Sequence, residues 1–206
     1  MKLDHLVWAS NSLDTAVAAF EQLSGVTAGA GGRHLSIGSR NALADLGNEC
    51  YLAIDGPDPK QSLAGNYGAF LAGLADPVLW RFAVQTPDLK TAQKILAGHG
   101  LETAVKPGSR TTTGGELLEW DTLSVAGSDL GLGMPIIKTW RTDLHPSSEA
   151  PRGCRLVGLT VSHPKAEFLR GLYGELGILV DVKQAPAASL MAVIDGPRGR
   201  FTLPVS

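Results

Sequence analysis

The sequence has few cysteines and no recognisable cysteine motif. Only two of its 206 residues are cysteine, Cys50 and Cys154, and their spacing matches neither a metal-binding nor a redox motif. So small a number of thiols, without a disulfide framework, is typical of proteins in a reducing compartment. We therefore interpret both thiols as buried packing groups and expect a cytoplasmic protein.

Charge is also sparse, and this excludes two classes of partner. Charged residues make up 18% of the chain, the formal net charge is −2, and neither sign forms a long run. Binding to nucleic acid or to an anionic membrane surface needs a basic patch, so we expect neither partner. No stretch approaches the ~18 uninterrupted apolar residues of a membrane-spanning helix. The opening residues, MKLDHLVWAS, lack the apolar core of a signal peptide, and we expect a soluble protein.

What the sequence does contain is a repeated order of segments. A short segment rich in β-formers occurs at 3–9, at 79–85 and at 156–161. After each one, apolar residues recur with the spacing of one helix face, and a glycine ends the pattern. Strand-like segments follow each predicted helix, three of them in the second and third repeats and two in the first, where a glycine-rich loop at 27–39 leads into them. The sequence therefore predicts the order βαβββ three times, with a period of roughly 75 residues.

Two connectors divide the chain into three predicted modules. The first connector is rich in Gly, Ala and Pro and is predicted to contain a short helix within residues 62–74, whereas the second is a polar surface loop. We expect the modules to form one compact unit. The predicted boundaries are residues 1–57 for module one, 58–78 for the first connector, 79–141 for module two, 142–153 for the polar loop and 154–206 for module three.

Several stretches that together span nearly the whole chain carry a resemblance to a known family. They are LDHLVWAS at 3–10 with the helix after it, GGRHLSIGSRNALADLGNECYLAIDGPDP at 31–59, PGSR at 107–110, MPIIKTW at 134–140 and LVGLTVSHP at 156–164. The chain resembles the glyoxalase-like domains of the vicinal-oxygen-chelate (glyoxalase/bleomycin-resistance/extradiol-dioxygenase) superfamily. The combination of GGRH, GSRNAL and YL is the most specific part of this resemblance.

The resemblance implies an α+β fold. In that superfamily, paired βαβββ modules close a curved mixed sheet into a cup around a cavity, with helices on the convex side. We expect modules one and two to form the principal cup. Module three is expected either to cover an edge of the cup or to pair across a homodimer, and both alternatives stay open.

The resemblance also implies where a metal would bind. In metal-using members, ligands from the first and last strands of each module hold a divalent ion that chelates vicinal oxygens of the substrate. His5 occupies one such position, but Ala53 stands where related sequences often have glutamate, and Arg81 and Gly158 stand at the positions equivalent to His5. Asp55 shares the face of Ala53, because alternate residues of a strand point the same way.

His5 and Asp55 are therefore the candidate ligands for one divalent ion, which would be Fe, Mn, Ni or Zn. Alternatively, Asp55 would hold His5 through the second ring nitrogen. The absence of the other expected ligands favours a cup that holds no metal.

Other polar residues are candidates for contact with a small molecule. His34 lies in a glycine-rich segment, where backbone amides approach ligands closely. Arg40 and Asn41 suit a carboxylate or a carbonyl, although Asn41 also suits a turn. Arg81 interrupts an apolar strand, so it lies either at an edge or in the cup as an anion clamp. Tyr51 points the same way as the candidate metal ligand on its strand.

Two functions remain open at this stage. The first is a metal-assisted lyase, isomerase or dioxygenase that acts on a small oxygenated substrate, as the resemblance implies. The second is a non-catalytic protein that binds or sequesters a small molecule, as some resistance proteins do, and the missing ligands support it. No GxSxG motif or Cys/His arrangement indicates nucleophilic catalysis, so the sequence assigns no catalytic residue.

Overall fold

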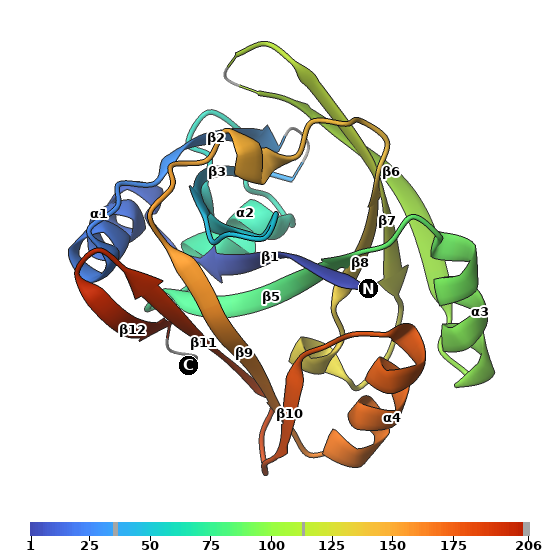
Figure 1. Cartoon of the computed structure of the whole chain (residues 1–206). Coiled ribbons are helices and arrows are strands. Elements are labelled where there is room, and N and C mark those ends of the chain that lie inside the picture. The colour runs from blue at the N-terminus through green and yellow to red at the C-terminus, as the bar shows by residue number, and fades with distance from the viewer. Residues whose placement is uncertain (35–36, 113, 204–206) are drawn as a thin grey trace.

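The strands form two sheets in the computed structural model, which describes residues 1–34, 37–112 and 114–203 (Figure 1). The larger sheet contains β1 (Lys2–Ala9), β2 (Gly29–His34), β3 (Ser39–Asp45), β4 (Tyr51–Pro57), β5 (Val78–Gln85), β6 (Thr103–Thr111), β7 (Leu117–Val125) and β8 (Ile136–Trp140). The smaller sheet contains β9 (Arg155–His163), β10 (Asp181–Gln184), β11 (Ser189–Gly196) and β12 (Gly199–Leu203).

The described residues form four α-helices between these strands, and the limits of the helices follow local sequence signals. The helices are α1 (Leu13–Ser24), α2 (Tyr67–Ala72), α3 (Leu89–Gly98) and α4 (Ala166–Leu176), with 3-10 turns η1 (Gly131–Gly133) and η2 (Pro146–Ser148). Ser12 caps α1 by accepting a hydrogen bond from the backbone N–H of Thr15, and Asp88 caps α3 in the same way. Gly25, with φ of 79°, ends α1 in the left-handed conformation that glycine favours. In the described part of the chain, no helix is both long and apolar enough to cross a membrane.

Modules one and two form a single curved sheet. Its strand order is β2-β3-β4-β1-β5-β8-β7-β6. In each half the first strand of the module runs parallel to the last one, β1 with β4 and β5 with β8, and the antiparallel pair of β1 and β5 joins the halves. The predicted α+β fold, the βαβββ order and the cup formed by the first two modules are confirmed.

Module three has the same order of elements but a different pairing. Its sheet has the order β10-β9-β11-β12, so its first strand pairs with the second and third strands rather than with the last. The last strand, β12, pairs with β11. The predicted last strand extended to Pro204, which lies outside the described residues. Module three is therefore not a third half-cup, although its segments follow each other in the same order.

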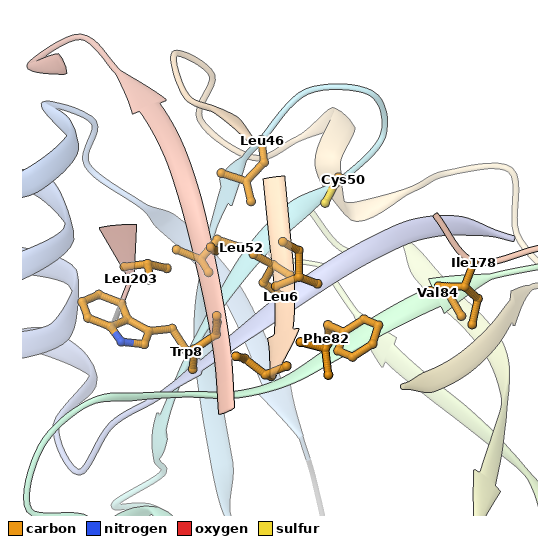
Figure 2. Close-up of a cluster of buried hydrophobic side chains, with 14 of the residues drawn as sticks. Leu6, Trp8, Leu46, Cys50, Leu52, Phe82, Val84, Ile178 and Leu203 are labelled. Carbon is orange, nitrogen blue, oxygen red and sulfur yellow. The ribbon is translucent and has the colours of Figure 1, made fainter. Parts of the chain in front are cut away.

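Module three packs against the convex face of the cup. Strand alternation turns Leu6, Leu52 and Phe82 away from the concave side, and all three are completely buried (Figure 2). They share one apolar cluster with Leu203 of β12 and Ile178, which follows α4. The expectation that module three covers an edge of the cup is therefore wrong. The convex face carries the large apolar side chains, so covering it removes more apolar surface from water than covering an edge.

The glycine-rich segment after α1 is a strand and not a loop. Gly29–His34 forms β2 and pairs with β3. Gly31 lies so close to β3 that a Cβ atom there would overlap the side chain of Asn41.

Pro107, which is within β6, is compatible with a strand because β6 lies at the end of the sheet. The two cysteines are buried and free, as predicted, and burial raises the pKa of Cys50 to about 12.

Candidate functional site

A small pocket lies on the concave face of the larger sheet. Its volume is about 60 Å³. Three walls of this inner pocket are the indole rings of Trp120 and Trp140 and the ring of Tyr51, and Ala53 leaves space on β4. The polar side chains that line it are His5, His34, Asn41, Asp55, Arg110 and Lys138.

A larger pocket adjoins the inner one at the ends of the sheet. It has a volume of about 750 Å³ and lies between β2 and β6. The two pockets share His34, Arg110 and Trp120 as lining residues. The larger pocket therefore lies next to the inner pocket, on the side of these three residues.

A β-bulge brings Asp4 and His5 together. In a regular strand, consecutive side chains point to opposite faces of the sheet. The pairing of β1 with β5 shifts register between Leu3 and His5, and Nδ1 of His5 hydrogen-bonds Oδ1 of Asp4. A bulge re-aims side chains in this way. Strict alternation therefore could not have identified Asp4 as a partner of His5.

Asp4 is the anchor of a buried hydrogen-bond network. Its side chain is completely buried, and its Oδ2 accepts hydrogen bonds from Nε1 of Trp140 (2.7 Å) and Nε2 of His145 (3.2 Å). Burial alone would raise the pKa of Asp4. The hydrogen bonds from His145 and His5, with the positive charge of Lys138, outweigh burial and hold that pKa well below its usual range. Asp4 is therefore ionised.

His5 is a neutral imidazole with a fixed orientation. Burial lowers its pKa, and the hydrogen bond and negative charge of Asp4 oppose this only in part. Because Nδ1 donates to Asp4, Nε2 carries the lone pair, and none of the described residues hydrogen-bonds to it. The ring stacks on Tyr51 with 4.8 Å between centroids. Such an oriented imidazole has the features of a general base.

Lys138 places its amine inside the cup. Its side chain is 9% exposed, and its Nζ lies 4.5 Å from the ring centroid of Trp120 and 5.0 Å from that of Trp140. None of the described residues accepts a hydrogen bond from this group or forms a salt bridge with it. Burial lowers its pKa to about 8, while the negative charges of Asp4 and Asp55 oppose the shift. The amine is thus left for a ligand.

Asp55 is held on the other side of the pocket by Tyr67. Its Oδ2 accepts a hydrogen bond from the hydroxyl of Tyr67 (3.1 Å), and its Oδ1 has no partner among the described residues. Burial raises the pKa of Asp55 to about 7, against the opposing effects of Tyr67 and Asn41. The carboxylate that holds His5 is therefore that of Asp4, and Asp55 does not take the role that the sequence suggested for it.

These residues do not fit a divalent ion. Among the described residues, no three His, Cys, Asp or Glu side chains converge in the way a metal site requires. Ala53 offers a methyl group at the position where relatives often have glutamate. The amine of Lys138 faces the same pocket as His5 and, when protonated, repels a divalent cation.

Not all the binding candidates lie in the inner pocket. His5, His34, Asn41, Tyr51 and Asp55 line it together. His34 also hydrogen-bonds Oγ of Ser39 (2.9 Å), and burial lowers its pKa to about 4.

Two predicted binding residues lie elsewhere. Arg40 forms a salt bridge with Asp14 of α1, with 3.2 Å between Nη2 and Oδ1. Arg81 lies over the ring of Trp80 and donates to the carbonyl of Gly131 (3.0 Å). Neither side chain lines the inner pocket, so Arg81 is not an anion clamp there. The other alternative for Arg81, a place at an edge of the sheet, is also wrong, because β5 lies between β1 and β8.

The sequence-based assignment missed two cations of the site. Lys138 and Arg110 lie in the stretches MPIIKTW and PGSR, which carried the resemblance but were assigned no binding role. The clearest signal was a lysine within the apolar segment IIKTW. Arg110 is buried and donates from Nη1 to the carbonyl of Gly31 (2.7 Å), which joins β6 to β2 across the mouth of the cup.

Comparison with known proteins supports this architecture. The sequence model of a family described as a glyoxalase-like domain matches residues 3–177. Comparison with curated proteins finds no similar sequence. A solved structure of a hypothetical protein from Staphylococcus aureus is similar, with a TM-score of 0.68, 14% identity, and coverage of 91% of this chain and 87% of that one.

Two methylmalonyl-CoA epimerases have lower structural similarity to this chain. Methylmalonyl-CoA epimerase from Mycobacterium tuberculosis has a TM-score of 0.45 and 20% identity, over 68% of this chain and 86% of that one. A Streptomyces coelicolor methylmalonyl-CoA epimerase in complex with 2-nitronate-propionyl-CoA has a TM-score of 0.47 and 17% identity, over 70% of this chain and 99% of that one.

Proposed function

This chain belongs to the family of glyoxalase-like domains, and on that premise we propose that its inner pocket binds a small molecule through carbonyl or carboxylate oxygens and transfers a proton next to them, without a divalent ion. The observation that carries the proposal is the buried amine of Lys138, which has no acceptor among the described residues. The amine opens into the inner pocket, where an oxygen of a ligand can accept its hydrogen bonds.

Lys138 supplies positive charge where metal-using relatives have an ion. In its protonated form it lies between two indole rings in a pocket largely closed to water, where a charge interacts strongly with a ligand oxygen. Arg110 is a second cation at the mouth of the same pocket. Negative charge that develops on a ligand oxygen would be stabilised by these two groups.

Asp4 and His5 supply the base. The lone pair on Nε2 of His5 has no protein partner among the described residues, and Asp4 fixes the tautomer and the ring orientation. Removal of a proton next to a carbonyl by His5 would produce an enolate, whose oxygen Lys138 would stabilise. The supported reaction class is therefore isomerisation or lysis through proton abstraction. The alternative, a non-catalytic binding protein, needs the same pocket but no base.

Replacing Lys138 with methionine is expected to weaken the binding of acetate by about tenfold, because a charge-assisted hydrogen bond is lost. Wild-type affinity should also fall as the pH rises through about 8, where Lys138 loses its proton. Ionisation of Asp55 above about pH 7 adds negative charge and acts in the same direction. Isothermal titration calorimetry from about pH 6 to about pH 9 measures both effects.

The matched control for this binding experiment is Lys183→Met. Lys183 is exposed on β10 and lies 3.7 Å from Asp181, so its loss should leave acetate affinity unchanged. Equal affinities for Lys138→Met and wild type would contradict the proposal. So would stoichiometric Fe, Mn, Ni or Zn in the purified protein that disappears in His5→Ala.

Replacing His5 with glutamine is expected to slow the exchange of the methyl protons of pyruvate with D2O by about a hundredfold. The reason is that a general base typically accelerates a proton transfer by at least about a hundredfold. Proton NMR measures the exchange rate. Binding of acetate by His5→Gln should persist, because Lys138 and Arg110 remain. If wild type binds acetate normally but does not accelerate the exchange, the result favours the non-catalytic alternative.

A further inference from the structure

We propose that the amine of Lys138 is a carbonyl-capturing nucleophile, which forms a covalent imine with a small oxo acid, an aldehyde or ketone that carries a carboxylate. This inference rests on the proposed function, because the same pocket must first bind the molecule. It goes beyond electrostatic binding, because Nζ of Lys138 would form a covalent bond to the bound molecule.

Lys138 differs from every other lysine of the chain in its surroundings. The other lysines are all exposed, whereas the side chain of Lys138 is 9% exposed and enters the inner pocket from β8. Lys2, Lys165 and Lys183 each contact a carboxylate. No carboxylate forms such a contact with Lys138 in the described chain, so no ion pair holds its amine away from a ligand.

The surroundings of Lys138 also keep part of its amine unprotonated near neutral pH. Burial, the largest effect, lowers its pKa to about 8, whereas an exposed lysine has a pKa of about 10.4. The unprotonated form is the nucleophile, and buried lysines provide it readily. The titratable groups that face this amine are Asp4 and His5 from β1, His34 from β2, Tyr51 and Asp55 from β4 and Arg110 from β6.

Asp55, which lines the same pocket, can supply the acid that imine formation needs. The lone pair of Nζ forms a C–N bond to the carbonyl carbon, and the proton that leaves nitrogen balances the one that the oxygen gains. A carboxyl group protonates the hydroxyl of this carbinolamine, the C–O bond breaks, and water leaves as the C=N bond forms. Asp55, with a pKa of about 7, is partly protonated near neutrality and can give and regain that proton. No oxidant or reductant is required.

The pocket also selects the size and charge of the carbonyl compound. The inner pocket has a volume of only about 60 Å³, so it suits a small carbonyl compound. Arg110 uses Nη1 for the carbonyl of Gly31, and no described residue accepts a hydrogen bond from its other N–H groups, which can bind a carboxylate. Glyoxylate, an aldehyde joined directly to a carboxylate, has both features.

The test is reductive trapping with glyoxylate. The full chain is incubated with glyoxylate and sodium cyanoborohydride at neutral pH, and modified lysines are located by peptide mass spectrometry over time. Lys138 should gain a carboxymethyl group at least about tenfold faster than exposed Lys106, because more of its amine is unprotonated. Acetate should slow the modification of Lys138 and leave that of Lys106 unchanged.

Two variants keep this test independent of folding. Lys138→Met should lose the fast phase of modification, and Lys106→Met should retain it, with circular dichroism confirming that both are folded. Modification of Lys138 no faster than that of Lys106, or fast modification that acetate does not slow, would overturn the imine. If acetate still raises the melting temperature of wild type in that case, the proposed function stands. If neither acetate nor glyoxylate raises it, the proposed function fails as well.

Discussion

Replacing Asp4 with alanine is expected to lower the free energy of unfolding by about 3–5 kcal/mol, the range found when one partner of a buried charged network is removed. Asp4 is completely buried and accepts hydrogen bonds from His5, Trp140 and His145. Without it, these donors lose their acceptor inside the protein, where water does not replace it. Urea denaturation followed by circular dichroism at neutral pH measures the change.

The pH dependence of stability provides a second measurement on Asp4. Its pKa is lower in the folded protein than in the unfolded chain, so ionised Asp4 stabilises the fold above about pH 4, and this contribution is lost as the pH falls below that value. Asp4→Asn should therefore show a flatter loss of stability in acid than wild type. The control is Asp14→Ala, an exposed salt-bridge partner of Arg40, which should change stability by no more than about 1 kcal/mol. A similarly small effect of Asp4→Ala would contradict the anchoring role of the network.

Replacing Phe82 with alanine is expected to lower the free energy of unfolding by about 3–5 kcal/mol, as truncation of a buried aromatic ring usually does. Phe82 lies on the convex side of β5 and is completely buried (Figure 2). Its ring lies edge-on to that of Tyr173 in α4, with 6.4 Å between centroids. The cavity would therefore weaken the contact between the cup and module three.

Unfolding of Phe82→Ala should remain a single transition, because one apolar cluster includes both sheets. Urea denaturation followed by tryptophan fluorescence and by far-ultraviolet circular dichroism should give the same midpoint. All four tryptophans lie in the larger sheet, so fluorescence reports on the cup. The control is Phe168→Ala in α4, whose side chain is 37% exposed and should contribute less than about 1 kcal/mol. Two separate midpoints would show that the cup and module three unfold independently.

The positions of the helices and strands could be predicted from the sequence more fully than the pairing of the strands. Caps such as Ser12 and Asp88, and the left-handed glycine at position 25, act within a few residues, so helix limits were visible without the fold. The glycine-rich strand β2 was not visible, since glycine has a low intrinsic preference for strands and is required there by close contact with β3. The different pairing in module three depends on contacts between distant segments, which the order of elements does not encode.

The candidate site was predictable only where regular alternation held. Tyr51 and Asp55 are separated by an even number of residues on β4, and both face the inner pocket as expected. Arg40 and Asn41 are adjacent on β3, so alternation allowed only one of them to face it, and Asn41 is the one that does. The contact between Asp4 and His5 could not be predicted from alternation, because it depends on the register shift in β1.

The hydrogen bond between Arg110 and Gly31 also bears on how two copies of the chain would associate. β2 and β6 are the terminal strands of the larger sheet, and an unprotected terminal strand can recruit a strand from another molecule. Here these two strands approach each other, and Arg110 occupies the carbonyl of Gly31. Strand addition at β2 would have to displace this contact, whereas strand addition at β10 or β12, the terminal strands of the smaller sheet, would leave it intact.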